Sequence, residues 1–100
     1  MEFKISGRHV EITPAIHDYA RKKTDRLHKY FDRIQAIEAV VQKKDRHFEV
    51  EVICDIEHHT PLVAALKAED VYAAIDQVTD IMERQLTDHK EKLRNRKHIA

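Results

Sequence analysis

The strongest constraint on this chain is an alternation of apolar and polar side chains between residues 48 and 57, interrupted only at Ile53. Phe48, Val50, Val52, Cys54 and Ile56 alternate with neighbours that are mostly acidic. Successive side chains of a β-strand point to opposite faces, so a period of two predicts a strand with one buried face. The pattern therefore predicts a sheet that is covered on one side, and it places Cys54 on the covered side.

Shorter alternations of the same kind predict three more strands, over residues 3–7, 37–41 and 62–68. Polar, turn-like segments at residues 43–47 and 58–61 separate the last three strands of the set. Turns this short join neighbouring antiparallel strands, so these three strands are expected to form a meander.

Two segments have the three- and four-residue apolar spacing of amphipathic helices. Thr13-Pro14 is a helix-start signal, because a threonine side chain accepts a bond from a free backbone N–H and proline suits the first helical position. The pattern that follows predicts a helix of about 17 residues. Its apolar stripe is Ile16, Tyr19, Ala20, Leu27, Tyr30 and Phe31. Asp70 is a candidate cap for a second helix, with the stripe Val71, Ala74, Ile75, Val78, Met82, Leu86, His89 and Leu93.

The predicted order of elements is β-α-β-β-β-α, an α+β fold. A strand–helix–strand opening forms a parallel pair by a right-handed crossover, which leaves both helices on one face of a four-stranded sheet. With 100 residues the chain is too short for two ordinary domains, so residues 1–100 are expected to form one domain. The basic C-terminal end, from about residue 95, is expected to fray.

The composition argues for a reducing compartment. The single cysteine cannot form an intramolecular disulfide, which excludes a disulfide-stapled secreted scaffold. The uncharged runs are far shorter than the roughly 18 residues that a membrane span needs, and residues 1–4 lack the order of a signal peptide. A cytoplasmic protein without a membrane partner is expected.

Catalysis and metal binding find little support in the residues. One glycine cannot build a glycine-rich phosphate loop, and a cysteine on a buried strand face is normally inert. The eight histidines are scattered, and none is four residues from another, so a structural metal site is not expected. We expect a non-enzyme that needs no cofactor.

The charges balance overall but are unevenly distributed along the chain. Eighteen basic residues match eighteen acidic ones, which argues against strong, sequence-independent nucleic-acid binding, and no DNA partner is expected. Residues 21–33 nevertheless hold six basic and two acidic residues, and residues 90–98 hold five and one. Residues 36–69 hold four basic and seven acidic residues. This distribution predicts basic helices and an acidic open sheet face, so a polyanion would be drawn to the helical side.

The basic residues on the two helices are the candidate phosphate-binding groups. Those on the first helix are Lys22, Arg26, Lys29 and Arg33, and those on the second are Arg84, Lys90, Arg94 and Lys97. The alternative interpretation is that these are solvated helix faces with ordinary i, i+4 pairs, as for Asp88 and Lys92. Two basic ridges on one side of the same sheet favour phosphate binding.

Two blocks of the sequence together resemble a known family. The first enters and fills the first helix: Gly7, Val10-Glu11-Ile12-Thr13, Tyr19, Lys23, Leu27 and Tyr30-Phe31-Asp32-Arg33. The second opens the last helix: Tyr72-Ala73-Ala74-Ile75-Asp76, Arg84-Gln85-Leu86 and Lys90. Over nearly the whole chain they resemble the bacterial ribosome hibernation promoting factors, also called ribosome-associated inhibitors or sigma-54 modulation proteins.

The resemblance implies a function as well as a fold similar to double-stranded-RNA-binding domains. It implies binding to the small ribosomal subunit and its rRNA, in the channel that holds messenger RNA and the anticodon ends of transfer RNA. Occupation of that channel would block translation and favour paired, dormant ribosomes in stationary phase, together with a small ribosome modulation factor. A chain that stops just after the second helix resembles the short form of the family. The rRNA contacts carried over from the family are Lys23, Arg26, Arg84, Lys90 and Arg94.

A second class of function stays open at this point. One of the family names suggests a protein-interaction regulator, linked to sigma-54 or to the phosphotransferase system. Its natural surface would be the acidic sheet face, which includes Glu49, Glu51 and Asp55. Loss of charge on the helices would impair a ribosome binder, whereas loss of charge on the sheet would impair a regulator.

Overall fold

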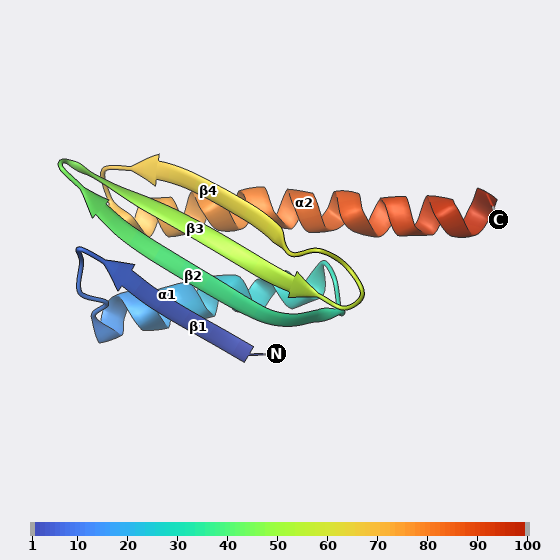
Figure 1. The fold of residues 1–100 in the computed structure, drawn as a ribbon, viewed down its shortest axis with the longest axis horizontal. Coiled ribbons are helices and arrows are strands. Elements are labelled where there is room, and N and C mark those ends of the chain that lie inside the picture. The colour runs from blue at the N-terminus through green and yellow to red at the C-terminus, as the bar shows by residue number, and fades with distance from the viewer. Residues whose placement is uncertain (1, 100) are drawn as a thin grey trace.

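The structure, a computed structural model, describes residues 2–99, with side chains described as far as Arg94. Seven elements follow one another along the chain (Figure 1). They are β1 (Glu2–Arg8), α1 (Pro14–Asp25), the 3₁₀-helix η1 (Arg26–Lys29), β2 (Ile34–Lys44), β3 (His47–Ile56), β4 (Leu62–Ala68) and α2 (Val71–Ile99). This order confirms the α+β class that the sequence predicts.

The four strands form one sheet in the order β1-β2-β3-β4. β1 and β2 are parallel, whereas β2–β3 and β3–β4 are antiparallel, as expected from the connections. Phe3, Ile37, Cys54 and Leu62 stand opposite one another across the four strands. Each belongs to the alternation predicted to be buried, so the phase of every strand is confirmed. Both helices lie behind the same face of the sheet (Figure 1).

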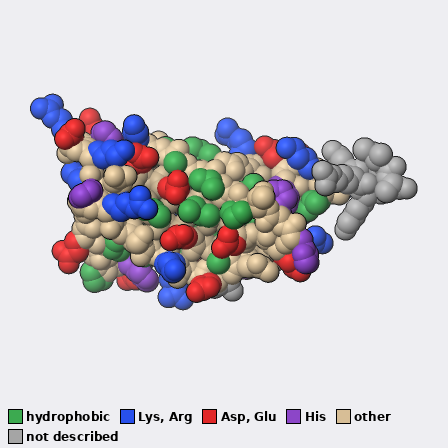
Figure 2. Space-filling model, in the orientation of Figure 1, with side chains coloured by type: hydrophobic (Ala, Val, Ile, Leu, Met, Phe, Trp, Pro, Cys, Tyr) green, Lys and Arg blue, Asp and Glu red, His purple; other side chains and the backbone are tan. Residues whose placement is uncertain are grey.

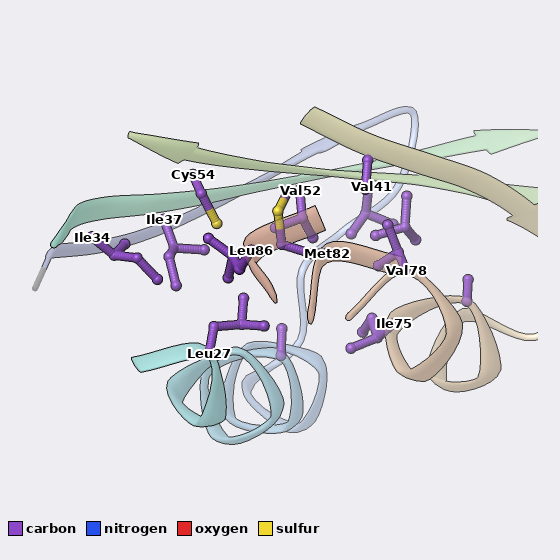
Figure 3. Packing of buried hydrophobic residues seen from close by; sticks show 14 of the residues in the cluster. Leu27, Ile34, Ile37, Val41, Val52, Cys54, Ile75, Val78, Met82 and Leu86 are labelled. Atoms are coloured by element: carbon purple, nitrogen blue, oxygen red, sulfur yellow. The ribbon is translucent and has the colours of Figure 1, made fainter. Parts of the chain in front are cut away.

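The core fills the space between the sheet and the two helices. Ile37 and Cys54 point down from the sheet, Leu27 points up from η1, and Met82 and Leu86 come from α2 (Figure 3). All five are at most 1% exposed. Burying an aliphatic side chain of this size contributes about 1.5–3 kcal/mol, so these contacts fix both helices to the sheet.

The first helix is shorter than its apolar pattern predicts. α1 ends at Asp25, and η1 continues the chain with tighter turns. The hydroxyl of the buried Thr24 donates to the carbonyl oxygens of Ala20 and Arg21, at 2.8 and 3.3 Å, and so competes for acceptors at this end of the helix. Three- and four-residue spacing does not distinguish an α-helix from a 3₁₀ turn. The prediction is also wrong for Tyr30, which is 38% exposed and is not part of the buried stripe.

Both predicted helix caps are present. The Thr13 side chain accepts a hydrogen bond from the backbone N–H of Ile16 at 3.2 Å, with Pro14 at the start of α1. The Asp70 carboxylate accepts from the backbone N–H of Ala73 at 3.0 Å. These side chains satisfy donors that a helix N-terminus leaves without partners, and they explain where each helix begins.

Gly7 allows the chain to turn back tightly after β1. A Cβ atom at this position would collide with the carbonyl oxygen of Val10 and lie 3.1 Å from the side chain of Ile12. Only glycine leaves room for this close approach of backbone to backbone. The segment that leads from β1 into α1 therefore depends on Gly7.

α2 is much longer than the other helix. Its 29 residues span about 43 Å, and its C-terminal part extends past the end of the sheet (Figure 1). The expected fraying from about residue 95 falls on residues 95–100, whose side chains lie outside the described part of the chain. Within residues 2–99, neither helix combines the length and apolar composition that crossing a bilayer requires.

The buried position of Cys54 generates a prediction for thiol labelling. Burial raises the pKa of its thiol from 9.0 to about 12, with a smaller contribution from Asp55. The thiolate is the reactive form, so labelling of the native protein at pH 8 should be roughly a thousandfold slower than for an ordinary cysteine. Cys54 is the only cysteine, so absorbance with a thiol reagent measures it directly. Fast labelling before unfolding, at the rate seen in guanidinium, would contradict the buried phase of β3.

Candidate nucleic-acid interface

The basic residues predicted to bind phosphate are mostly on the two helices. Their exposed members are Lys22, Arg26, Lys29, Arg84, Lys90 and Arg94, and Lys23 is half-buried. The predicted position of Arg33 on the first helix is wrong, because this residue lies in the loop between η1 and β2. Its carbonyl oxygen accepts from the backbone N–H of Glu57 at 3.2 Å, which ties this loop to the end of β3. Lys97 lies outside the residues whose side chains are described.

Asp76 of α2 joins the two helices through two contacts with α1. The Tyr19 hydroxyl donates to Asp76 Oδ1 at 2.7 Å, and Lys23 Nζ lies 3.2 Å from the same oxygen. Lys23 Nζ also lies 5.5 Å from the centre of the Tyr19 ring, and that ring packs edge-on against Tyr72 with centroids 5.0 Å apart. The long side chain of Lys23 is therefore held by the Asp76 carboxylate and the Tyr19 ring at the boundary between the helices.

These contacts shift the ionisation of both partners in the hydrogen bond. The bond from Tyr19 favours the ionised form of Asp76, and Lys23 acts in the same direction, so the pKa of Asp76 lies below its ordinary 3.8. The same hydrogen bond raises the pKa of Tyr19 above 10.0, with desolvation and the charge of Asp76 adding to the shift. Asp76 is thus charged and Tyr19 is protonated at neutral pH, which is the arrangement that the hydrogen bond requires.

A second ion pair crosses the same boundary further along the helices. Arg26 Nη2 lies 3.3 Å from Glu83 Oε1, seven residues after Asp76 on α2. Tyr19 contacts Asp76, and Arg26, later in the chain, contacts Glu83, which is also later in α2. The two helices therefore run in the same direction (Figure 1). Positions seven apart share one face of a helix, and the next step from Glu83 is Lys90. The α2 flank that faces α1 is therefore acidic at first and becomes basic at Lys90.

The pairing changes which predicted cations are free. Lys23 and Arg26 are each matched by a carboxylate of α2, so their charges are partly used within the domain. Within the described part of the chain, no ion pair engages the other exposed cations among the predicted phosphate-binding residues of the helices. These free cations are Lys22, Lys29, Arg84, Lys90 and Arg94.

The open face of the sheet is less uniformly acidic than the sequence predicts. Its middle strands β2 and β3 carry the carboxylates Glu38, Glu49, Glu51 and Asp55. The bases Lys4, Arg8, Lys44 and Lys67 also lie on this face, and Lys44 Nζ is 3.2 Å from Glu49. Figure 2 looks onto this face, where hydrophobic side chains gather near the centre with acidic ones beside them. The face is therefore an acidic and apolar centre with a mixed rim.

Metal ligation is not a feature of the described residues. No group of three or more His, Cys, Asp or Glu side chains within the described part of the chain is arranged to hold an ion. His89 instead packs its ring edge-on against Phe31 and His59, with centroids 5.2 and 4.4 Å apart. The cluster lies where η1, the β3–β4 turn and α2 meet.

Sequence reasoning did not identify the acidic side of this interface. Tyr19 and Asp76 stand 57 residues apart, and so do Arg26 and Glu83, so no local pattern connects them. The apolar stripes of the two helices could have indicated these carboxylates, because two helices on one face of a sheet must lie side by side. From that placement, carboxylates on the flank of one helix are the expected partners for cations on the other.

Asp76 generates a prediction for stability and its pH dependence. Asp76→Asn removes the charge that Lys23 and Tyr19 contact, and it should lower the free energy of unfolding by about 1 kcal/mol at pH 7. Because folding lowers the pKa of Asp76, its carboxylate contributes fully to the free energy of unfolding above pH 3.8. This contribution is lost as the pH falls through the pKa of the folded state. Urea unfolding at pH 7 and below pH 3.8 should therefore show a difference that shrinks in acid.

The matched control is Asp80→Asn, an exposed aspartate on α2 without an ion pair among the described residues. This control should change stability by less than about 0.5 kcal/mol at either pH. An Asp76→Asn difference that is equally large in acid would mean that the loss comes from packing and not from charge.

Comparison with known proteins places the chain among relatives of one kind. Residues 3–94 match the family described as Sigma 54 modulation protein / S30EA ribosomal protein. The ribosome hibernation promoting factor of Klebsiella oxytoca is 38% identical over 97 residues, which covers 94% of this chain and 98% of the relative. The factor of the same name from Azotobacter vinelandii is 36% identical over 92 residues, 92% of this chain and 85% of the relative.

A solved structure agrees with the sequence comparison. The crystal structure of the N-terminal domain of Thermus thermophilus Protein Y superposes with a TM-score of 0.82 at 32% identity. The match covers 89% of this chain and 99% of that domain, so the two share the whole arrangement of sheet and helices. The chain belongs to the Sigma 54 modulation protein / S30EA ribosomal protein family.

Proposed function

We propose that this protein is a ribosome hibernation factor that binds the small ribosomal subunit through its helical side. Membership of a family whose relatives carry that name supports a hibernation role. The observation that carries the choice of surface is the set of free cations on the helices, which no described carboxylate neutralises. Such groups are available to displace counterions from rRNA phosphates.

The free cations are spread along the two parallel helices. Lys22 precedes Lys23, which pairs with Asp76, whereas Lys29 follows Arg26, which pairs with Glu83. On α2, Arg84, Lys90 and Arg94 follow 8, 14 and 18 residues after Asp76, so they lie about 12–27 Å further along the helix. Cations spread over this length would contact different stretches of rRNA backbone, and that geometry suits a folded RNA channel better than a single phosphate.

In this proposal the protein acts by occupying space and not by catalysis. Bound in the channel for messenger RNA and the transfer-RNA anticodon ends, a domain of this size excludes both ligands and blocks translation. The bound subunit would enter the dormant, paired ribosomes of stationary phase in the cytoplasm, with a small ribosome modulation factor as a further partner. No cofactor takes part.

A regulator that binds another protein through the open sheet face remains the second candidate. The observation that favours it is the apolar centre of that face, where Val63 is 47% exposed and stands opposite Ile53. Glu51 and Asp55 lie next to these side chains, so a basic partner with apolar groups would fit.

Two charge-reversal variants separate these candidates. The helix variant carries Lys22→Glu, Lys29→Glu and Lys90→Glu, which avoids the cations that hold α1 to α2. It should bind small subunits at least about tenfold more weakly at 0.1 M salt and with a shallower salt dependence, because three phosphate contacts become repulsive. Co-sedimentation with purified subunits over a series of salt concentrations measures both quantities, and cell-free translation measures the inhibition.

The sheet variant, with Glu38→Lys, Glu51→Lys and Asp55→Lys, is the matched control with the same number of reversals. It should keep binding and inhibition, or bind more tightly as repulsion from rRNA falls. Circular dichroism checks that both variants are folded. Loss of binding by the sheet variant alone would show that the RNA surface is the open sheet face and not the helical side. A wild type that neither binds nor inhibits would favour the regulator.

A further inference from the structure

Tyr30 is an aromatic side chain on the helical side that the core does not use. It follows η1 directly and is 38% exposed, although Phe31 beside it is buried. Tyr30 forms one wall of an open hollow of about 460 Å³, within the range of small-molecule sites. The residues of α2 that line the rest of the hollow are Asp80, Glu83, Arg84, Thr87 and Asp88.

The outward face of α2 supplies free polar groups to this hollow. Asp80, Arg84 and Thr87 follow the spacing i, i+4, i+7, so they share one face of the helix. Glu83 is occupied, because it pairs with Arg26 at 3.3 Å, and its carbonyl oxygen accepts from the Thr87 hydroxyl at 2.9 Å. Among the described side chains, neither Asp80 nor Arg84 has an ion pair, so both can meet a ligand.

Phosphate binding alone does not explain this composition. Carboxylates on a surface that faces rRNA repel the backbone, and an exposed tyrosine contributes little to phosphate affinity. The three side-chain types together suit an unpaired nucleotide. Aromatic rings stack on unpaired bases, carboxylates accept from the N–H groups of base edges, and arginine contacts phosphate.

We propose that the hollow between Tyr30 and α2 holds one unpaired nucleotide of RNA, guanine by preference. The base stacks on the Tyr30 ring, Asp80 accepts from the base edge, and Arg84 contacts the phosphate. Guanine fits best because N1–H and the N2 amino group are neighbouring donors that match the two oxygens of one carboxylate. This inference rests on the proposed function, since it requires the helical side to face rRNA.

The contribution of stacking is tested by substitutions at Tyr30. Tyr30→Ala should weaken binding of the full-length protein to small subunits by about 5- to 150-fold, whereas Tyr30→Phe keeps the ring and should bind like wild type. The control is Ile81→Ala, which removes a side chain of α2 with the same 38% exposure that does not line the hollow. It should leave affinity unchanged, and thermal unfolding monitors stability in all three variants.

The role of Asp80 is tested by the sign of a charge effect. If its carboxylate only repels rRNA, Asp80→Asn should tighten binding, because a negative charge disappears. If the carboxylate holds a base edge, the same substitution should weaken binding by at least about fivefold. Kethoxal, which modifies N1 and N2 of unpaired guanines, should show one guanine of the small-subunit rRNA that wild type protects and that Asp80→Asn leaves reactive.

These outcomes separate the nucleotide site from the proposed function. If wild type binds the subunit but Tyr30→Ala binds equally well, or Asp80→Asn binds more tightly, the nucleotide site is wrong and ribosome binding stands. An identical kethoxal pattern for wild type and Asp80→Asn likewise excludes contact with a guanine edge. If wild type does not bind the subunit, the proposed function fails and the nucleotide site fails with it.

Discussion

The Asp76 carboxylate is the contact on which the helical side of this domain depends. It accepts the Tyr19 hydroxyl and pairs with Lys23, so one group of α2 holds two side chains of α1. Apolar burial attaches each helix to the sheet, but burial is not directional and does not set how two parallel helices lie relative to each other. Directional contacts of Asp76, followed by Arg26 with Glu83, supply that alignment and so set where the cations of α1 and η1 lie relative to those of α2.

The balanced net charge follows from the same contacts. Part of the acidic complement sits on the α2 flank that faces α1, where it is matched by cations within the domain. The cations that remain free are those that point outward or lie beyond the end of the sheet. Acidic residues on the sheet stand on the opposite side of the domain, where they repel a polyanion from the wrong surface. A chain with no net charge can therefore present one side that attracts RNA.

Much of the fold follows from the sequence, because each strand and each helix stripe encodes its own buried face. The alternation around Cys54 and the signals at Thr13 and Asp70 predict the strands, the caps and the layer of helices correctly. The pattern overextends the first helix, since Leu27 in η1 and Phe31 in the loop after it are buried and so continue the apolar spacing beyond the end of α1. It also buries Tyr30 wrongly, because a stripe does not show where the packed surface stops.

The interface is less predictable than the fold. The basic residues are visible as runs in the sequence, but which of them are free depends on carboxylates more than 50 residues away along the chain. Lys23 and Arg26 look like their neighbour Lys22 in the sequence and differ from it only after the helices pack. Arg33 continues the basic run of residues 21–33 in the sequence, but it lies in the loop between η1 and β2. The sequence thus shows where the basic residues cluster, whereas the tertiary structure decides which of them pair with a carboxylate.

The orientation of the bound domain tests the central claim most directly. A cryo-electron microscopy reconstruction of the small subunit with this protein would show which side faces rRNA. The account predicts that α1, η1 and the end of α2 contact the rRNA backbone and that the open sheet face, with Glu51 and Asp55, points away from it. A complex in which the sheet face lies on rRNA while Lys22 and Lys90 face solvent would contradict the account.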